Sequence, residues 1–395
     1  MSMPAISRKH LDFAAKLLFF LTLIGFAFTS FLQGGMDFRG YYAAGKLVLR
    51  GGNPYEYAQI APVLEEVTGW RGNNPYYYPP WFALLFVPLA LLPFQVARGV
   101  WLAINVVLFY LSLEYLRKGL HWQVTGWARW IAYWAAILMF AVYCMVREQA
   151  GILTLFGLAF ALKSTREDRP ALVGLGFVIA LAKPQVTALA VLLTALWMLS
   201  RRATSPALWT AVWLVVLALV ASVAIPRWWQ FDRSGFAEGI TYQLDGPDQI
   251  ASRRIYATAY HFFAYVFRMS APQQYLATAV IGLLGGGLAA IVWRRIDSAC
   301  AVLSVSTMLS LLITPYVLQY DYVVLTIPLF WIFSHMRSLH LWLRVIVIVV
   351  LVASFSVQIW QTWSYQGYWQ LLGVLAAFAL VVKAELSRRR IALGK

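Results

Sequence analysis

The sequence predicts an all-α polytopic membrane protein. Of its 395 residues, 61% are hydrophobic and only 12% are charged, whereas average soluble domains carry about 25% charged residues. Apolar runs of about 18 or more residues recur along the whole chain, and runs of this length are typical of membrane-spanning helices. We therefore expect a single membrane-embedded catalytic domain over residues 1–395 and no separate soluble domain.

The placement of the basic residues predicts how the chain crosses the membrane. Many cations lie in short turns between apolar runs, and cytoplasmic turns carry an excess of Lys and Arg. The net charge of +16 therefore indicates topology and not a nucleic-acid partner. We expect both termini in the cytoplasm and the chain in the plasma (inner) membrane of a bacterium. The basic turns that fix this orientation contain Arg117-Lys118, 163–169, Arg201-Arg202, Arg294-Arg295 and 388–390.

With this orientation the apolar runs give roughly twelve spans. The first, 13–31, follows Arg8-Lys9-His10 and is too long for a cleaved signal peptide, so we interpret it as an uncleaved first span. The remaining spans are expected over 95–116, 130–146, 150–162, 171–182, 186–199, 208–225, 275–293, 299–313, 323–333, 341–358 and 368–383.

Two long loops are expected on the outer side of the membrane. The first covers 34–94 and is rich in Gly, Pro, Tyr and Asn, and long ordered loops are often functional. It contains an apolar stretch over 81–92 that is too short to cross a bilayer. Because Pro79-Pro80 suits a helix start, we interpret this stretch as an interfacial helix. The second loop covers 226–272.

Asp37, directly after the first span, is the candidate catalytic base. A carboxylate at the membrane boundary is costly to keep there without a task. A helix cap or a salt bridge to Arg39 is the alternative. The outer ends of several spans carry further candidates. For a donor phosphate these are Lys183, Arg253, Arg254 and His261, and for the sugar or acceptor they are Arg39, Tyr41, Tyr78, Glu148, Gln149, Gln185, Tyr320 and Asp321.

Several of these candidates also have a structural alternative. Lys183 could extend to the membrane surface beside a proline break, and His261 could be a core residue. Arg253 and Arg254 could contact lipid headgroups, although the guanidinium fork suits phosphate oxygens.

Motifs for soluble cofactors are absent from the sequence. It contains no Walker loop, no Rossmann glycine pattern and no His-Glu-x-x-His metal signature. Cys144 and Cys300 lie in apolar runs and are expected to be small buried side chains. We therefore expect no cofactor and no metal ion.

Several motifs, in their order along the chain, resemble glycosyltransferase family 87. They are Asp37-Phe38, Gly52-Asn53-Pro54-Tyr55, Tyr78-Pro79-Pro80, Leu92-Pro93, Trp101 with Asn105, Lys183-Pro184-Gln185, Thr314-Pro315-Tyr316 and Tyr320-Asp321. The resemblance implies a GT-C type fold, a polyprenol-phosphate-mannose donor, an active site on the outer face and Asp37 as base. The sequence departs from the family at 148–151, where the family tends to show a Gly-Gln pair followed by Asn.

The residues themselves agree with this implied chemistry. A polyprenyl-phosphate sugar needs no nucleotide-binding domain, and its phosphate is a good leaving group. The minimal machinery is one base for the acceptor hydroxyl and cations for the leaving phosphate. We expect transfer to a lipid or glycan acceptor with inversion at the anomeric carbon. A transporter or flippase of lipid-linked glycans is the main alternative, and a membrane protein without catalysis is the other.

Overall fold

The computed structural model describes residues 7–33, 37–69, 76–229, 258–314, 317–361 and 368–393. Within these ranges the chain folds into helices joined by short turns, and no β-strand occurs among the described residues. The α-helices are α1 Arg8–Gln33, α2 Phe38–Leu49, α3 Tyr57–Thr68, α4 Pro80–Phe86, α5 Phe94–Gly119, α6 Trp127–Ala136, α7 Val142–Val146, α8 Gly151–Arg166, α9 Pro170–Ala180, α10 Pro184–Ser200, α11 Ser205–Ala224, α14 Ala259–Val266, α15 Ala271–Arg295, α16 Ala299–Ile313, α17 Thr326–His335, α18 Leu341–Gln361 and α19 Tyr368–Leu393. Short 3₁₀ helices are η1 Leu89–Leu91, η4 Gln319–Leu325 and η5 Met336–Ser338, and η2 Ile137–Ala141 is a π-helical turn between α6 and α7.

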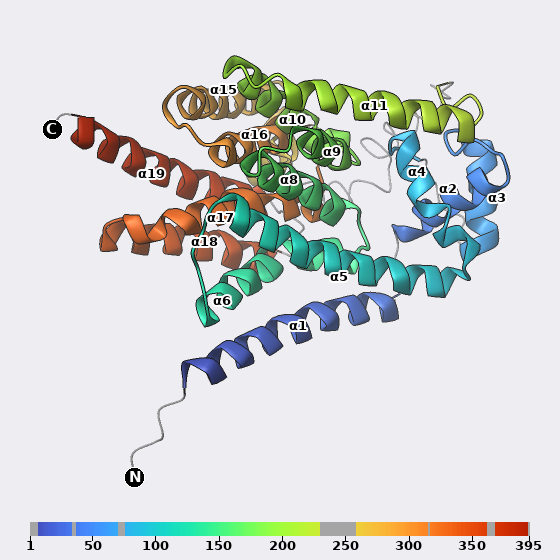
Figure 1. Cartoon of the computed structure of the whole chain (residues 1–395), viewed down its shortest axis with the longest axis horizontal. Helices are drawn as coiled ribbons and strands as arrows, with labels where there is room; N and C mark the ends of the chain where they lie inside the picture. Colours follow the sequence, from blue (N-terminus) through green and yellow to red (C-terminus); the bar gives the residue numbers. More distant parts are fainter. Residues whose placement is uncertain are drawn as a thin grey trace, which may run out of the picture.

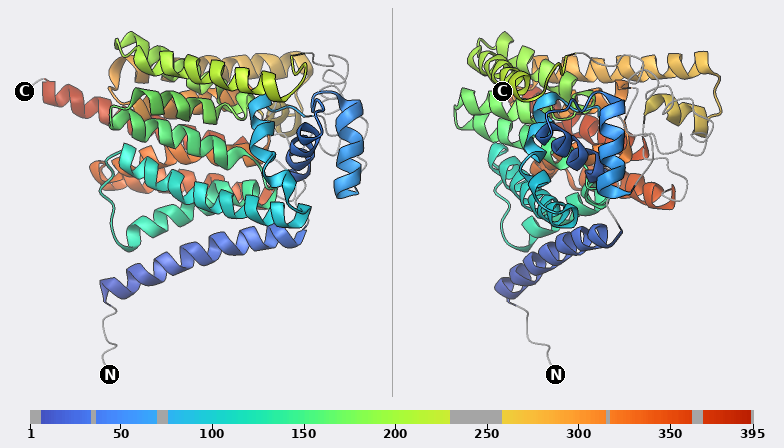
Figure 2. Two further views of the ribbon diagram at one scale, coloured as in Figure 1. Left: turned by 45° about the vertical axis from the view of Figure 1, so that its right-hand side comes forward. Right: turned by 90° about the vertical axis from the view of Figure 1, so that its right-hand side faces the viewer.

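Most of the helices lie side by side along the long axis of the molecule (Figure 1). Helices α2, α3 and α4 gather at one end of this bundle, on the right of Figure 1 and again in the left view of Figure 2. We call these three helices together with η1 the cap. The start of α1 and the end of α19 lie at the opposite end.

The bundle has the surface of a membrane protein. Six of the described helices are long and apolar enough to cross a membrane, and shorter apolar helices include α9, α10 and α16. Large apolar side chains on α11 and α15 are exposed, among them Leu219 and Leu283. Such side chains suit contact with lipid tails, in which only structures with internally paired backbones are stable. The number of spans, roughly twelve, stays a prediction.

The first predicted loop differs from the expectation because much of it is helical. Its aromatic residues, whose density suggested a loop, form a core of their own, in which Tyr41 packs against Phe82 and Phe86 with ring centroids 5.2 and 5.0 Å apart. Gly45 brings α2 directly onto α4, since a Cβ there would lie 2.6 Å from the backbone carbonyl carbon of Phe86. The interfacial helix predicted over 81–92 corresponds to α4 and η1, two pieces separated at Val87-Pro88.

Close packing of α8 fixes the turn that precedes it. Helix α8 lies between α5 and α9. Its Gly157 faces α9 so closely that a Cβ would lie 2.4 Å from the backbone nitrogen of Ala180. The turn 147–150 therefore stands next to the beginning of α5 and the turn between α9 and α10, where the polar candidates of the sequence converge.

Candidate active site

Gln149 joins three segments that are distant in the sequence. Its Oε1 accepts hydrogen bonds from the hydroxyl of Tyr41 at 3.0 Å and from Nζ of Lys183 at 2.9 Å. The same side chain donates to the carboxyl group of Asp37. Gln149 is 2% exposed. A buried amide that offers both a donor and an acceptor can hold an anion and a cation at once.

Lys183 lies at the N-cap of α10, in the turn after α9, because Pro184 occupies the first position of that helix. Its Nζ forms a buried ion pair with Oδ1 of Asp321 at 2.5 Å, and it also lies 4.5 Å from the centroid of the Tyr320 ring. The second carboxylate oxygen of Asp321 accepts from the backbone N–H of Leu318 at 3.0 Å. Burial lowers the pKa of Lys183, but the neighbouring Asp321 outweighs this, so the pKa is raised and the ammonium stays charged.

Asp37 stands at the N-cap of α2, half-buried, and its side chain makes no capping hydrogen bond. Burial raises the pKa of this carboxyl group, while the hydrogen bond from Gln149 and the charges of Arg147 and Lys183 lower it, and the net shift is upward. A carboxylate with a raised pKa is a stronger base, which is the property required of a group that accepts a proton from a hydroxyl.

Tyr41 from the cap and Tyr78 from the segment just before α4 form one wall of this cluster. The hydroxyl groups of Tyr41 and Tyr78 are 2.8 Å apart, and their rings meet edge to face with centroids 4.9 Å apart. Burial raises the pKa of Tyr41 well above its ordinary value, so this side chain remains a neutral phenol. The ring of Tyr78 also stacks on Phe82. The cap thus contributes hydroxyl groups and aromatic faces beside Asp37.

A second buried network supports the turn that carries Gln149. Nε of Arg98 lies 2.7 Å from Oε1 of Glu148, and the two side chains are 2% and 0% exposed. The hydroxyl of Ser30 at the end of α1 also donates to this carboxylate at 3.1 Å, and the indole N–H of Trp101 donates to the Glu148 carbonyl at 2.9 Å. Glu148 has φ of +57°, a left-handed backbone that needs such support in a residue other than glycine.

Arg98 was not among the residues predicted from the sequence. It lies at the beginning of α5, inside the predicted span 95–116. A charged residue within an apolar run was the available signal, because such a residue is costly in lipid. Glu148, by contrast, was predicted to contact sugar or acceptor, but the contacts described for its side chain are with Arg98 and Ser30.

Two other predicted residues lie near the cluster in less specific surroundings. Arg39 is half-buried in the first turn of α2, two positions after Asp37. The Gln185 side chain is half-buried in the first turn of α10, and its backbone carbonyl accepts from the hydroxyl of Thr314 at 2.9 Å. Their predicted contacts with sugar or acceptor stay predictions.

The predicted phosphate-binding residues are only partly placed by the structure. His261 is buried in the first turn of α14, where its Nδ1 lies 2.7 Å from the hydroxyl of the N-cap residue Thr258. This contact is the one expected of a structural histidine. Arg253 and Arg254 lie outside the described residues.

The chemical groups of the cluster are therefore a carboxylate, an ammonium with its carboxylate partner, an amide and phenols. Within the described ranges, no group of three or more His, Cys, Asp or Glu side chains is placed to hold a metal ion. Cys144 and Cys300 are buried free thiols.

The comparison with known proteins identifies the family. The profile of glycosyltransferase family 87 matches residues 76–315, well over half of the chain. This stretch includes Tyr78, Gln149 and Lys183, while Asp37 and Asp321 lie outside it. Searches of curated proteins and of solved structures found no match. The resemblance expected from the sequence motifs is thus confirmed, and the chain belongs to glycosyltransferase family 87 as a multi-pass membrane glycosyltransferase.

Proposed function

We propose that this enzyme transfers a sugar, with mannose as the expected one, from a polyprenyl-phosphate donor to a lipid or glycan acceptor at the outer face of the membrane. The observation that carries the proposal is that the Asp37 carboxyl group and the Lys183 ammonium meet on the amide of Gln149. A base and a cation in one polar cluster are the parts that transfer from a phosphate donor requires.

Asp37 serves as the general base. It takes the proton of the acceptor hydroxyl while the hydroxyl oxygen attacks the anomeric carbon of the donor sugar. The new bond joins the acceptor oxygen to that carbon, and the bond from the carbon to the phosphate oxygen breaks with its electron pair. Attack opposite to the leaving group inverts the anomeric centre, as in inverting glycoside hydrolysis with water replaced by the acceptor.

Lys183 stabilises the charge that develops on the leaving phosphate. Asp321 holds the ammonium in place and keeps it protonated. Because Asp321 also neutralises part of the positive charge of Lys183, a second cation is needed for a tight donor complex. We assign this part to Arg253 and Arg254 of the second predicted loop, with His261 as a further candidate.

The tyrosines supply the walls of the sugar site. The phenols of Tyr41 and Tyr78 offer hydroxyl groups for sugar hydroxyls, and Tyr320 presents its ring beside Lys183. Arg39 and Gln185 complete the proposed contacts with sugar or acceptor. We assign Glu148 a supporting part in this scheme, because its buried pair with Arg98 shapes the turn of Gln149.

The decisive experiment replaces Asp37 by Asn in the purified full-length enzyme. Transfer from a panel of polyprenyl-phosphate sugars to acceptor is followed by mass spectrometry. Loss of a general base reduces transfer by about a hundredfold to ten-thousandfold, while donor binding remains. The matched control is Glu66→Gln, since Glu66 is an exposed acidic residue of the same cap that pairs with Arg50. Full transfer by Asp37→Asn would refute the proposed mechanism.

The same assay distinguishes an enzyme from a flippase. A flippase moves the intact lipid-linked sugar and forms no new glycosidic bond. The buried pairs Lys183–Asp321 and Arg98–Glu148 stand at helix ends or in turns, whereas transporters place ionisable groups near the middle of broken spans. Their position supports catalysis at the membrane surface.

A further inference from the structure

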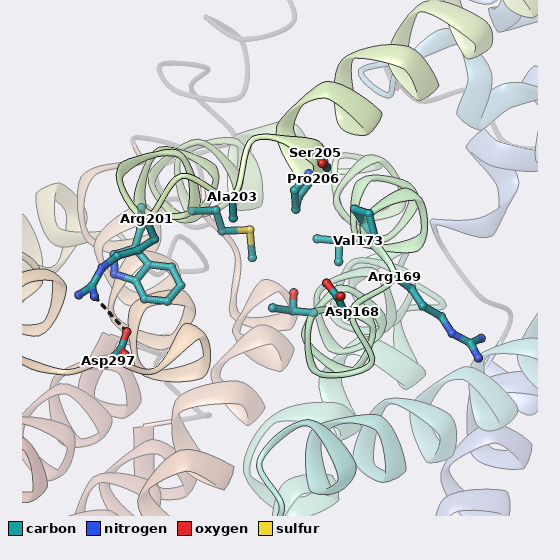
Figure 3. Close-up of a pocket in the computed structure, with 12 residues that line it drawn as sticks. Asp168, Arg169, Val173, Arg201, Ala203, Ser205, Pro206 and Asp297 are labelled. Atoms are coloured by element: carbon teal, nitrogen blue, oxygen red, sulfur yellow. Dashed lines mark ion pairs between the residues drawn. The ribbon is translucent and has the colours of Figure 1, made fainter.

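A cavity of about 540 Å³ lies among the ends of α8, α9, α10 and α11 (Figure 3). It is bordered by the turn 167–169, the turn 201–204 and Asp297 between α15 and α16. Helix α8 begins beside Gln149 and ends at this cavity, and its 16 residues span about 24 Å at 1.5 Å per residue. The cavity is therefore separate from the Asp37 cluster and lies at the end of the bundle opposite the cap.

Both signs of charge line the cavity. Asp168 turns its carboxylate toward the hollow in Figure 3, and it forms no ion pair within the described part of the chain. Asp297 lies on the other side, 3.3 Å from Arg201. Arg169 extends from the rim away from the hollow, and its side chain is 63% exposed. Two arginines and two aspartates balance each other in the lining.

Donors for an anion gather at the rim. Helices α9 and α11 both begin there, and their N-cap residues, Arg169 and Thr204, make no side-chain cap hydrogen bond. Pro170 and Pro206 have no backbone N–H. The donors that remain in these first turns are the N–H groups of Ala171, Ser205 and Ala207, which lie at the positive end of the helix dipole and suit a phosphate. Trp197 is 8% exposed, and its indole N–H has no acceptor within the described ranges. The remaining wall is apolar and includes Val173, Met198 and Pro206.

We propose that this cavity binds the headgroup of a zwitterionic phospholipid that carries a primary ammonium and a phosphodiester. The ammonium enters the hollow and pairs with Asp168, while the phosphate stays at the rim with Arg169, Arg201 and the helix N-termini. The acyl chains then leave outward along the apolar surface of the bundle. A headgroup with both charges matches a lining with both charges, whereas a purely anionic headgroup would leave Asp168 opposite an anion.

The position at the ends of apolar helices agrees with a lipid as occupant. Such helix ends lie at the depth of phospholipid headgroups, where Trp and Arg side chains are enriched. Glycerophosphoethanolamine offers the same two charged groups without acyl chains, so a soluble ligand of this class would use the same contacts.

Native mass spectrometry of the purified full-length enzyme tests the proposal. Phosphatidylethanolamine, phosphatidylcholine, phosphatidylglycerol and soluble glycerophosphoethanolamine are compared as ligands. We expect phosphatidylethanolamine to bind best, because the trimethylated group of phosphatidylcholine has no N–H to donate to Asp168. Asp168 is exposed, so Asp168→Asn should weaken the binding of phosphatidylethanolamine about three- to fivefold, the effect of an exposed ion pair. Glu66→Gln, which changes an exposed carboxylate of the cap that pairs with Arg50, is the matched control.

Three results would overturn the proposal. They are equal binding of phosphatidylethanolamine and phosphatidylcholine by the unaltered enzyme, equal effects of Asp168→Asn and Glu66→Gln, and binding of neither ethanolamine compound. The first comparison needs no variant, so it decides even if Asp168→Asn fails to fold. If the lipid binds more tightly than glycerophosphoethanolamine, the ligand of this site comes from the membrane. If glycerophosphoethanolamine binds more tightly, the same contacts serve a soluble ligand.

Discussion

At the scale of single residues, the amide of Gln149 organises the site. It contacts the proposed base, the proposed phosphate-binding cation and Tyr41. Its hydrogen bond favours the ionised form of Asp37, while burial favours the protonated form. The balance of these two effects sets the pH range in which Asp37 can accept a proton.

The pH dependence of transfer follows from the raised pKa of Asp37. Only the deprotonated carboxylate acts as base, so kcat/KM should fall as the pH drops through this raised pKa, above the usual range of an aspartate. Gln149→Leu removes a hydrogen bond to the ionised form and should move this acidic limb upward by about one pH unit or more. Gln59→Leu changes a glutamine of α3 that pairs with Glu56, and it should leave the acidic limb in place. An unmoved limb in Gln149→Leu would contradict the assignment.

The role of Lys183 can be separated from its contribution to folding. Lys183→Met alone leaves Asp321 as a buried unpaired charge, at a cost of about 3–5 kcal/mol. Adding Asp321→Asn removes that charge and keeps an oxygen for the Leu318 N–H. We expect the double variant to regain its thermal unfolding midpoint but to transfer sugar about tenfold more slowly or worse, with a raised KM for donor. Recovery of both stability and transfer would show that the pair is structural only.

At the scale of elements, the start of α5 and the end of α1 hold the turn between α7 and α8. The buried pair Arg98–Glu148 and the hydrogen bonds of Ser30 and Trp101 converge on this turn. Since the turn contains Gln149 in the next position, the pair controls where the amide points. We infer that Arg98 is a positioning residue.

The variant Arg98→Met with Glu148→Gln tests this positioning role. Removing both charges avoids an unpaired buried carboxylate, so the protein should fold, but the turn loses its anchor. A misplacement near 1 Å costs about tenfold to a hundredfold in rate, so kcat should fall more than donor affinity. The exposed pair Arg50–Glu66 supplies the control, and Arg50→Met with Glu66→Gln should leave the thermal unfolding midpoint and kcat almost unchanged. If the double variant is less stable but keeps its kcat, Arg98 has a structural role alone.

Long apolar runs in the sequence predicted membrane helices well. The predicted span 208–225 corresponds to α11, Ser205–Ala224, because an apolar run in a bilayer must pair its own backbone. The cap was harder to predict. Helix α2 contains Gly40 and Gly45 and buries aromatic residues against α4, a contact between segments that no local pattern specifies.

The sequence predicted only part of the candidate site, again because contacts between distant segments have no local pattern. Asp37, Lys183 and Asp321 stood out as charges beside apolar runs, and the structure brings them together. Arg98 sits inside such a run, and its partner Glu148 is 50 residues away. The pairing depends on how α5 packs on α8, which periodicity in the sequence does not determine.

At the scale of the whole molecule, the two ends of the bundle have different chemistry. The cap end carries Asp37 and the buried pairs around Gln149. The opposite end carries the start of α1, the end of α19 and the basic turns, including Arg201-Arg202 and Arg294-Arg295. The positive-inside pattern predicts that this basic end lies in the cytoplasm, so we expect the proposed site to face outward.

Labelling of single cysteines from outside intact cells tests this orientation. Cys144 and Cys300 are buried, so a membrane-impermeant maleimide should react with an introduced exposed cysteine in preference to them. Glu66→Cys lies on the surface of the cap, and Arg166→Cys lies on the surface of the basic end. We expect labelling of Glu66→Cys in intact cells and of Arg166→Cys only after permeabilisation. The reverse pattern would place Asp37 on the cytoplasmic side, where an outer-face lipid-linked sugar could not reach it.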